Sequence, residues 1–133
     1  MKPLPPETDD ICTEDCIHPE SVHAARRIVL PMPDAQDVAA IFAALADPTR
    51  VRLLQALSAR ELCVCDLSLV LGLRQPAVSQ HLRVLRGQRI VRYRKEGRIA
   101  YYSLDNPYVA GLLQQGIVQA QGMNGDERAA GVA

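Results

Sequence analysis

Two short helical segments joined at a glycine, with two strand-like runs directly after them, constrain this chain more than any other feature. The first helical segment begins near Cys63 and stops at Gly72, because glycine accepts the left-handed conformation that ends many helices. The second covers residues 75–88 and carries apolar side chains at helical spacing, namely Val78, Leu82 and Leu85. This order of helix, glycine turn and helix predicts a helix-turn-helix.

The segment after the second helix has the composition of a β-hairpin. Residues 90–93 and 99–104 are rich in β-branched and aromatic side chains, and residues 94–98 between them form a charged turn. Gly97 supplies the positive φ angle that a tight turn needs. A hairpin directly after a helix-turn-helix forms a wing, so we predict a mainly α (α+β) fold, a winged helix-turn-helix with a two-stranded β-hairpin wing.

Four further helices complete the expected domain, over residues 19–30, 35–46, 48–58 and 107–121. Asp34 and Asp47 are the expected N-caps of the second and third of these. The last helix has a broad apolar face and few charges, so we expect it to pack on a partner chain. The chain then consists of a flexible N-terminal arm (residues 1–18), a helical domain (19–121) and a disordered polar tail (122–133).

A net charge of zero conceals an uneven distribution of charge along the chain. Residues 50–98 carry eleven basic and three acidic side chains, whereas residues 1–49 carry three basic and nine acidic ones. A basic segment that coincides with a helix-turn-helix is the electrostatic footprint expected of a nucleic-acid-binding protein.

Several classes of protein are disfavoured by what the sequence lacks. No apolar run approaches the roughly 18 residues of a membrane span, and the N-terminus lacks the basic-then-apolar order of a secretory signal. We therefore expect a cytoplasmic protein without a membrane partner, whose four cysteines are reduced thiols. No Ser/His/Asp order, phosphate loop or open metal site is visible, so we expect neither enzyme activity nor an organic substrate.

Four short motifs occur in a particular order and spacing, and they carry a family resemblance. They read Ala46-Asp-Pro-Thr-Arg50, Glu61-Leu-Cys-Val-Cys-Asp-Leu67, Ala77-Val-Ser-Gln-His-Leu-Arg83 and Tyr93-Arg-Lys-Glu-Gly-Arg98, the last followed by Tyr101-Tyr102. Over roughly residues 35–121 the chain resembles the ArsR/SmtB family of metal-responsive repressors. The resemblance implies a symmetric homodimer, built on the first and last helices, in which each protomer presents one recognition helix to an inverted-repeat operator.

The cysteines extend the resemblance to the cadmium- and lead-sensing branch of this family. Cys12 and Cys16 lie in the arm, and Cys63 and Cys65 lie at the start of the helix-turn-helix. The resemblance implies that the arm of one protomer meets the cysteine helix of the other in a four-thiolate site. Thiolates are soft ligands that suit zinc, cadmium and lead. Cys63 and Cys65 can share one metal only if their helix begins near Cys63, since residues i and i+2 of a regular helix diverge; otherwise they are ordinary buried cysteines.

Neighbouring side chains are alternative ligands, and one other site is missing. Zinc-sensing relatives use a histidine near position 18, so His18 is the alternate ligand, while His23 and Asp66 are weaker ones. Many relatives also bind zinc on the C-terminal helix, but at the equivalent positions this chain keeps only Asp105. Sensing then falls to the cysteine site, which favours a soft metal as inducer.

The expected DNA contacts lie on the second helix of the motif and on the wing. Polar residues that can reach base edges are Gln75, Ser79, Gln80 and His81. Arginines expected on phosphates are Arg74, Arg83 and Arg86, and basic residues of the wing are Arg94, Lys95 and Arg98. His81 has an equally good alternative role as a hydrogen-bonded histidine that links helices.

These features predict a transcriptional repressor that leaves its operator when cadmium, lead or zinc binds four cysteines, and the family implies control of metal efflux or resistance genes. One alternative is an arsenite sensor, in which Cys63, Cys65 and one arm cysteine bind trivalent arsenic. Another is a thiol redox switch, with a Cys12–Cys16 or Cys63–Cys65 disulfide controlling DNA binding.

Overall fold

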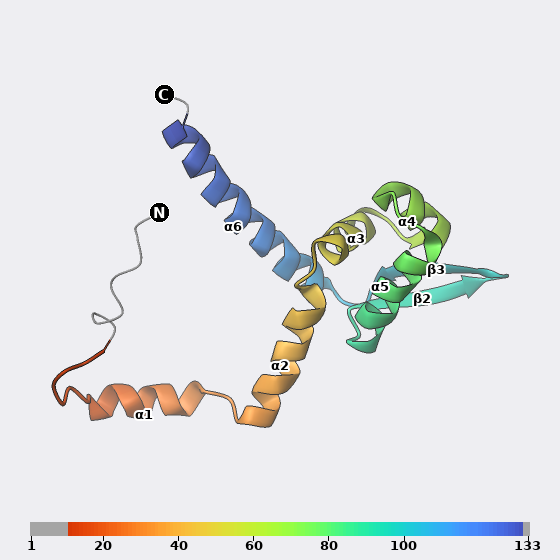
Figure 1. The fold of residues 1–133 in the computed structure, drawn as a ribbon. Helices are drawn as coiled ribbons and strands as arrows, with labels where there is room; N and C mark the ends of the chain where they lie inside the picture. The colour runs from red at the N-terminus through yellow and green to blue at the C-terminus, as the bar shows by residue number, and fades with distance from the viewer. Residues whose placement is uncertain (1–10, 132–133) are drawn as a thin grey trace. The chain divides into compact units, whose positions relative to one another are not determined.

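The computed structural model describes residues 11–131, which contain six helices and three strands (Figure 1). They are α1 (Pro19–Ile28), α2 (Met32–Leu45), α3 (Pro48–Ala59), β1 (Leu62–Cys63), α4 (Val64–Leu71), α5 (Gln75–Gly87), β2 (Val91–Glu96), β3 (Ile99–Leu104) and α6 (Pro107–Gly131). The chain divides into two units, Met1–Ala35 and Gln36–Ala133. Residues 1–10 of the predicted arm lie outside the described residues, as do the last two of the predicted tail.

The first unit contains irregular chain and one amphipathic helix. Residues 11–18 form no helix or strand, and α1 begins with Pro19 in its first turn, where the missing N–H of proline costs nothing. Glu20 near the start and Arg26 and Arg27 near the end complement the helix dipole. All side chains of residues 11–34 are exposed. This part of the chain therefore contributes no buried core of its own.

The hydrophobic core of the second unit lies beneath the helix-turn-helix. Asp47 caps α3 as predicted, because its carboxylate accepts a hydrogen bond from the backbone N–H of Arg50 at 3.0 Å. Side chains from α3, α4, α5 and the entry to the sheet are less than 2 % exposed: Leu53, Leu54, Leu67, Val78, Leu82, Leu85, Ile90 and Val91. Their burial supplies the main driving force for folding this unit.

The sheet has three strands, not the two that we predicted for the wing. Its order is β1-β3-β2, all antiparallel, with Leu62 opposite Tyr102 and Cys63 opposite Tyr101. The extra strand arises because Cys63 is the N-cap of α4 and has extended backbone angles, φ −86° and ψ 173°. The residues that enter the helix can therefore pair with the wing.

The hairpin turn is shorter than predicted. Strand β2 continues to Glu96, so residues 94–96 belong to the strand and the turn consists of Gly97 and Arg98. Gly97 has a φ of 64°, which confirms its predicted role. The charged residues of the expected loop are therefore held in fixed register opposite β3.

Two helix boundaries also differ from the predictions. Helix α2 begins at Met32, so Asp34 lies in its first turn instead of capping it, and Pro33 is tolerated because it precedes the regular hydrogen bonds. Helix α6 continues ten residues past the expected end at Gln121, to Gly131. The part of the predicted tail that the structure describes, residues 122–131, is thus helical. No described helix is by itself long and apolar enough to cross a membrane; α1 and α2 meet that criterion only when they are counted together.

Candidate nucleic-acid interface and thiol pairs

Helices α4 and α5 form the predicted helix-turn-helix, and local contacts fix the turn between them. Gly72 ends α4 with a φ of 66° and a ψ of 35°, the left-handed conformation. The backbone N–H of Leu73 donates to the carbonyl of Ser68 at 3.1 Å, and the Ser68 hydroxyl donates to the carbonyl of Leu73. Because these bonds hold both sides of the turn, the start of α5 has a defined position relative to α4.

Helix α5 buries one face and exposes the polar face predicted to read DNA. Val78, Leu82 and Leu85 are buried. The side chains left exposed include six of the predicted DNA contacts, Arg74, Gln75, Ser79, Gln80, Arg83 and Arg86. The N-terminal half of this face carries amides and a hydroxyl, which are the groups that read base edges in a major groove.

His81 stands apart from this exposed set. It is half-buried, and its Nδ1 accepts a hydrogen bond from Nε of Arg50, 3.2 Å away. Arg50 also donates to the carbonyl of Ala44 at 3.3 Å. These contacts favour the alternative role for His81, that of a histidine linking α5 to α3. Sequence reasoning gave Arg50 no role, since its partner lies 31 positions away.

Two arginines of the predicted DNA surface have partners within the protein. The Arg86 guanidinium stacks over the ring of Tyr93, 4.6 Å from its centroid. Arg94 forms a salt bridge with Glu61 at 2.7 Å, donates to Glu96 at 3.0 Å, and lies over the ring of Tyr101. The hydrogen bonds that Arg94 donates to Glu61, and secondly to Glu96, raise the pKa of its guanidinium above the ordinary value.

The remaining basic residues of the wing are differently placed. Lys95 and Arg98, at the tip of the hairpin, are exposed. Both salt bridges among the described side chains involve Arg94. Lys95 and Arg98 therefore take part in no salt bridge within the described residues, whereas Arg94 is paired with two carboxylates.

The first thiol pair, Cys63 and Cys65, lies at the N-terminus of α4. Cys63 is half-buried at the N-cap, where both its backbone N–H and its Sγ lie 3.2 Å from the Asp66 carboxylate. Cys65 is exposed, and the side-chain Nε2 of Gln75 donates to its Sγ at 3.3 Å. The helix thus begins next to Cys63, which was the condition set by the sequence for the two thiols to share one metal.

The second thiol pair, Cys12 and Cys16, lies in the irregular chain before α1. Both are exposed, and a hydrogen bond between the two thiols raises the pKa of Cys16 above its ordinary value. His18, the alternate ligand, is exposed at the N-cap of α1. Within the residues that the structure describes, no three metal-ligating side chains of one chain form a cluster.

Comparison with known proteins agrees with this architecture. The profile of the family described as "Bacterial regulatory protein, arsR family" matches residues 47–93, which run from the cap of α3 into the wing. The chain is 44 % identical over 105 residues to a transcriptional repressor SmtB homolog of Synechocystis, covering 79 % of this chain and 80 % of the relative. It is 40 % identical over 109 residues to a CadC homolog of Staphylococcus aureus, a cadmium resistance transcriptional regulatory protein, covering 81 % and 89 %.

A solved structure gives the same result for the fold. The chain is similar to the homodimeric winged helix-turn-helix DNA-binding domain of a possible ArsR-family transcriptional regulator from Mycobacterium bovis. The TM-score is 0.62 at 29 % sequence identity, over 65 % of this chain and 81 % of that one. The motifs, the winged helix and these relatives lead to one conclusion: the chain belongs to the ArsR/SmtB family of metal-responsive, winged-helix transcriptional repressors.

Proposed function

We propose that this protein represses transcription as a cytoplasmic homodimer on an inverted-repeat operator, and leaves the DNA when a soft metal ion binds Cys12, Cys16, Cys63 and Cys65. Cadmium, lead and zinc are the proposed ions, and the regulated genes serve metal efflux or resistance. The observation that carries the proposal is the position of Cys63 and Cys65 at the start of α4, where Cys65 contacts Gln75, the first residue of the recognition helix.

The chemistry of the donors fits a soft ion. Four thiolates suit tetrahedral zinc or cadmium. Cys65, Cys12 and Cys16 are exposed and accessible to an ion. The cadmium-related name of the Staphylococcus aureus relative supports the same choice. His18 remains the alternate fourth ligand.

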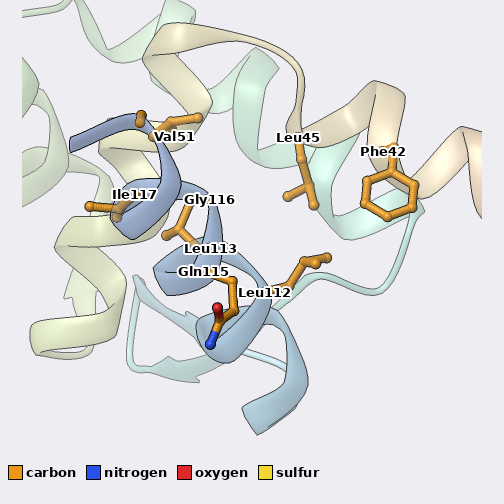
Figure 2. A pocket seen from close by; sticks show the side chains of 9 residues that line it. Phe42, Leu45, Val51, Leu112, Leu113, Gln115, Gly116 and Ile117 are labelled. Atoms are coloured by element: carbon orange, nitrogen blue, oxygen red, sulfur yellow. The ribbon is translucent and has the colours of Figure 1, made fainter. Parts of the chain in front are cut away.

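A second copy of the chain is the proposed source of the other two thiolates. An apolar groove between α2, α3 and α6 is lined by Phe42, Leu45, Val51, Leu112, Leu113 and Ile117, among others (Figure 2). Phe42 is 51 % exposed, and Val118 on α6 is 53 % exposed. Large exposed apolar surface marks an interaction site, and the Mycobacterium bovis relative is homodimeric. The dimer would bring the arm of one protomer to the α4 thiols of its partner.

The test measures binding of an operator duplex by fluorescence anisotropy while cadmium, lead, zinc or arsenite is added. We expect a soft divalent ion to lower operator affinity by about 5–150-fold. Cys63→Ser/Cys65→Ser and Cys12→Ser/Cys16→Ser should each abolish the response, whereas Thr13→Ala in the same arm should keep it.

Three other outcomes would favour an alternative function or contradict the proposal. A response to arsenite alone that survives loss of one arm cysteine supports the arsenite sensor. Release by an oxidant without any metal response supports the redox switch. Metal binding that leaves operator affinity unchanged contradicts the proposal.

A further inference from the structure

One side chain connects the α4 thiols directly to the helix that reads DNA. Gln75 is the first residue of α5, and its Nε2 lies 3.3 Å from Sγ of Cys65. Both side chains are exposed, so the contact is not a by-product of tight packing. The Gly72 turn, held by hydrogen bonds between Ser68 and Leu73, positions the start of α5, where Gln75 lies, relative to α4. The hydrogen bond between Gln75 and Cys65 therefore links the two helices.

The same amide is well suited to reading a base. Exposed polar groups at the N-terminus of a recognition helix face base edges in the major groove. Glutamine reads adenine in bidentate fashion, donating through its amide nitrogen and accepting through its oxygen. An Nε2 group oriented toward Cys65 is not available for that bidentate contact. The two uses of Gln75 thus compete.

We propose that Gln75 is the positioning residue that couples the Cys63/Cys65 pair to DNA reading, a proposal that rests on the function proposed above. When a soft ion binds Cys65, the S–H bond breaks, a sulfur–metal bond forms and the proton passes to solvent. The resulting thiolate sulfur accepts a stronger hydrogen bond than a thiol does. Gln75 is then held on the sulfur and withdrawn from the base edge.

Because coupling between two ligands is reciprocal, DNA must also weaken the binding of metal. An operator that draws Gln75 away removes a hydrogen bond from the Cys65 sulfur, and so lowers the affinity for metal by the same factor. The link involves one side chain and no change of backbone conformation, so its contribution can be separated from any rearrangement of the dimer.

The experiment compares Gln75→Ala with Gln80→Ala, an exposed glutamine on the same helix that has no hydrogen bond to a thiol among the described residues. Operator affinity is measured for each with and without cadmium, and cadmium affinity is measured without DNA by chelator competition. In the wild type, cadmium should lower operator affinity by a certain factor. We expect this factor to be about tenfold smaller in Gln75→Ala, because the variant lacks one hydrogen bond to a charged group. Gln80→Ala should lower both affinities and keep the ratio.

A second readout needs no operator. In the wild-type protein, the ¹⁵N and ¹H resonances of the Gln75 side-chain amide should shift when cadmium is added, and those of Gln80 should not. A wild-type operator affinity that ignores cadmium contradicts the proposed function itself. A normal wild-type response that is equally large in Gln75→Ala, or an unshifted Gln75 amide, overturns this inference and leaves the proposed function standing.

Discussion

Residues 11–34 and residues 47–104 contrast sharply in how far their side chains are engaged with the rest of the chain. In the first segment every side chain is exposed. In the second, eight apolar side chains are almost completely buried, and polar residues are tied across long stretches of sequence. Side chains with internal partners hold the fold, whereas those without are available to metal, DNA or a second protomer.

The two thiol pairs show the same contrast at the scale of single side chains. Cys12 and Cys16 are exposed free thiols in the irregular chain before α1. In contrast, Sγ of Cys63 lies 3.2 Å from the Asp66 carboxylate, and Sγ of Cys65 accepts a hydrogen bond from Gln75. The Cys63/Cys65 pair is therefore linked to other side chains of the helix-turn-helix.

The largest expected effect is a difference between the two segments in how far a substitution lowers the stability of the protein. Leu82→Ala removes a side chain that is 1 % exposed, and should lower the free energy of unfolding by about 2–5 kcal/mol because it leaves a cavity. Ile28→Ala, at a position 81 % exposed, should change it by no more than about 0.5 kcal/mol. Urea denaturation at one fixed protein concentration measures both. A loss at Ile28 as large as that at Leu82 would show that α1 is buried against a partner.

A smaller effect sharpens the contrast within the wing. Arg98→Ala should reduce the slope of log affinity for the operator against log salt concentration by about 1, because a phosphate contact is lost. Arg94→Ala should leave the slope unchanged, since Glu61 and Glu96 already neutralise that charge. Anisotropy titrations at several salt concentrations measure the slopes. An equal reduction in Arg94→Ala would mean that Arg94 leaves its carboxylates when DNA binds.

The smallest effect concerns the cap of α3 and depends on pH. The hydrogen bond from the Arg50 backbone N–H, aided by the backbone of Thr49 and the charge of Arg50, holds the pKa of Asp47 below its usual range. A group whose pKa is lowered by folding stabilises the protein above its unfolded pKa, and loses that contribution as the pH falls through the folded value. Wild type should therefore be more stable than Asp47→Ala at pH 7, and the difference should close below about pH 4.

Denaturation of both proteins across this pH range tests the prediction. Glu14→Ala, in the exposed segment, serves as the matched control and should track the wild type throughout. A difference between wild type and Asp47→Ala that persists in full at low pH would place the stabilisation in packing instead of in the carboxylate.

The features predicted correctly from the sequence are those that depend on neighbouring residues. The Asp47 cap, the Gly72 helix stop and the Gly97 turn each require only a few adjacent positions, because capping and positive φ angles are local properties. The features that sequence reasoning missed join distant residues. Arg50 and His81 are 31 positions apart, Arg94 and Glu61 are 33 apart, and neither pair belongs to a periodic pattern.

The sequence by itself determined the order of the helices and the wing hairpin, the buried face of α5, the family and the four candidate thiols, since periodicity, turn residues and motifs are written along the chain. Only the tertiary structure decided that Cys63 enters a third strand, that Arg94 is neutralised and that Gln75 lies on Cys65. The reason is physical: the partner of a polar side chain is set by which elements pack together, and packing brings together residues that no local rule connects.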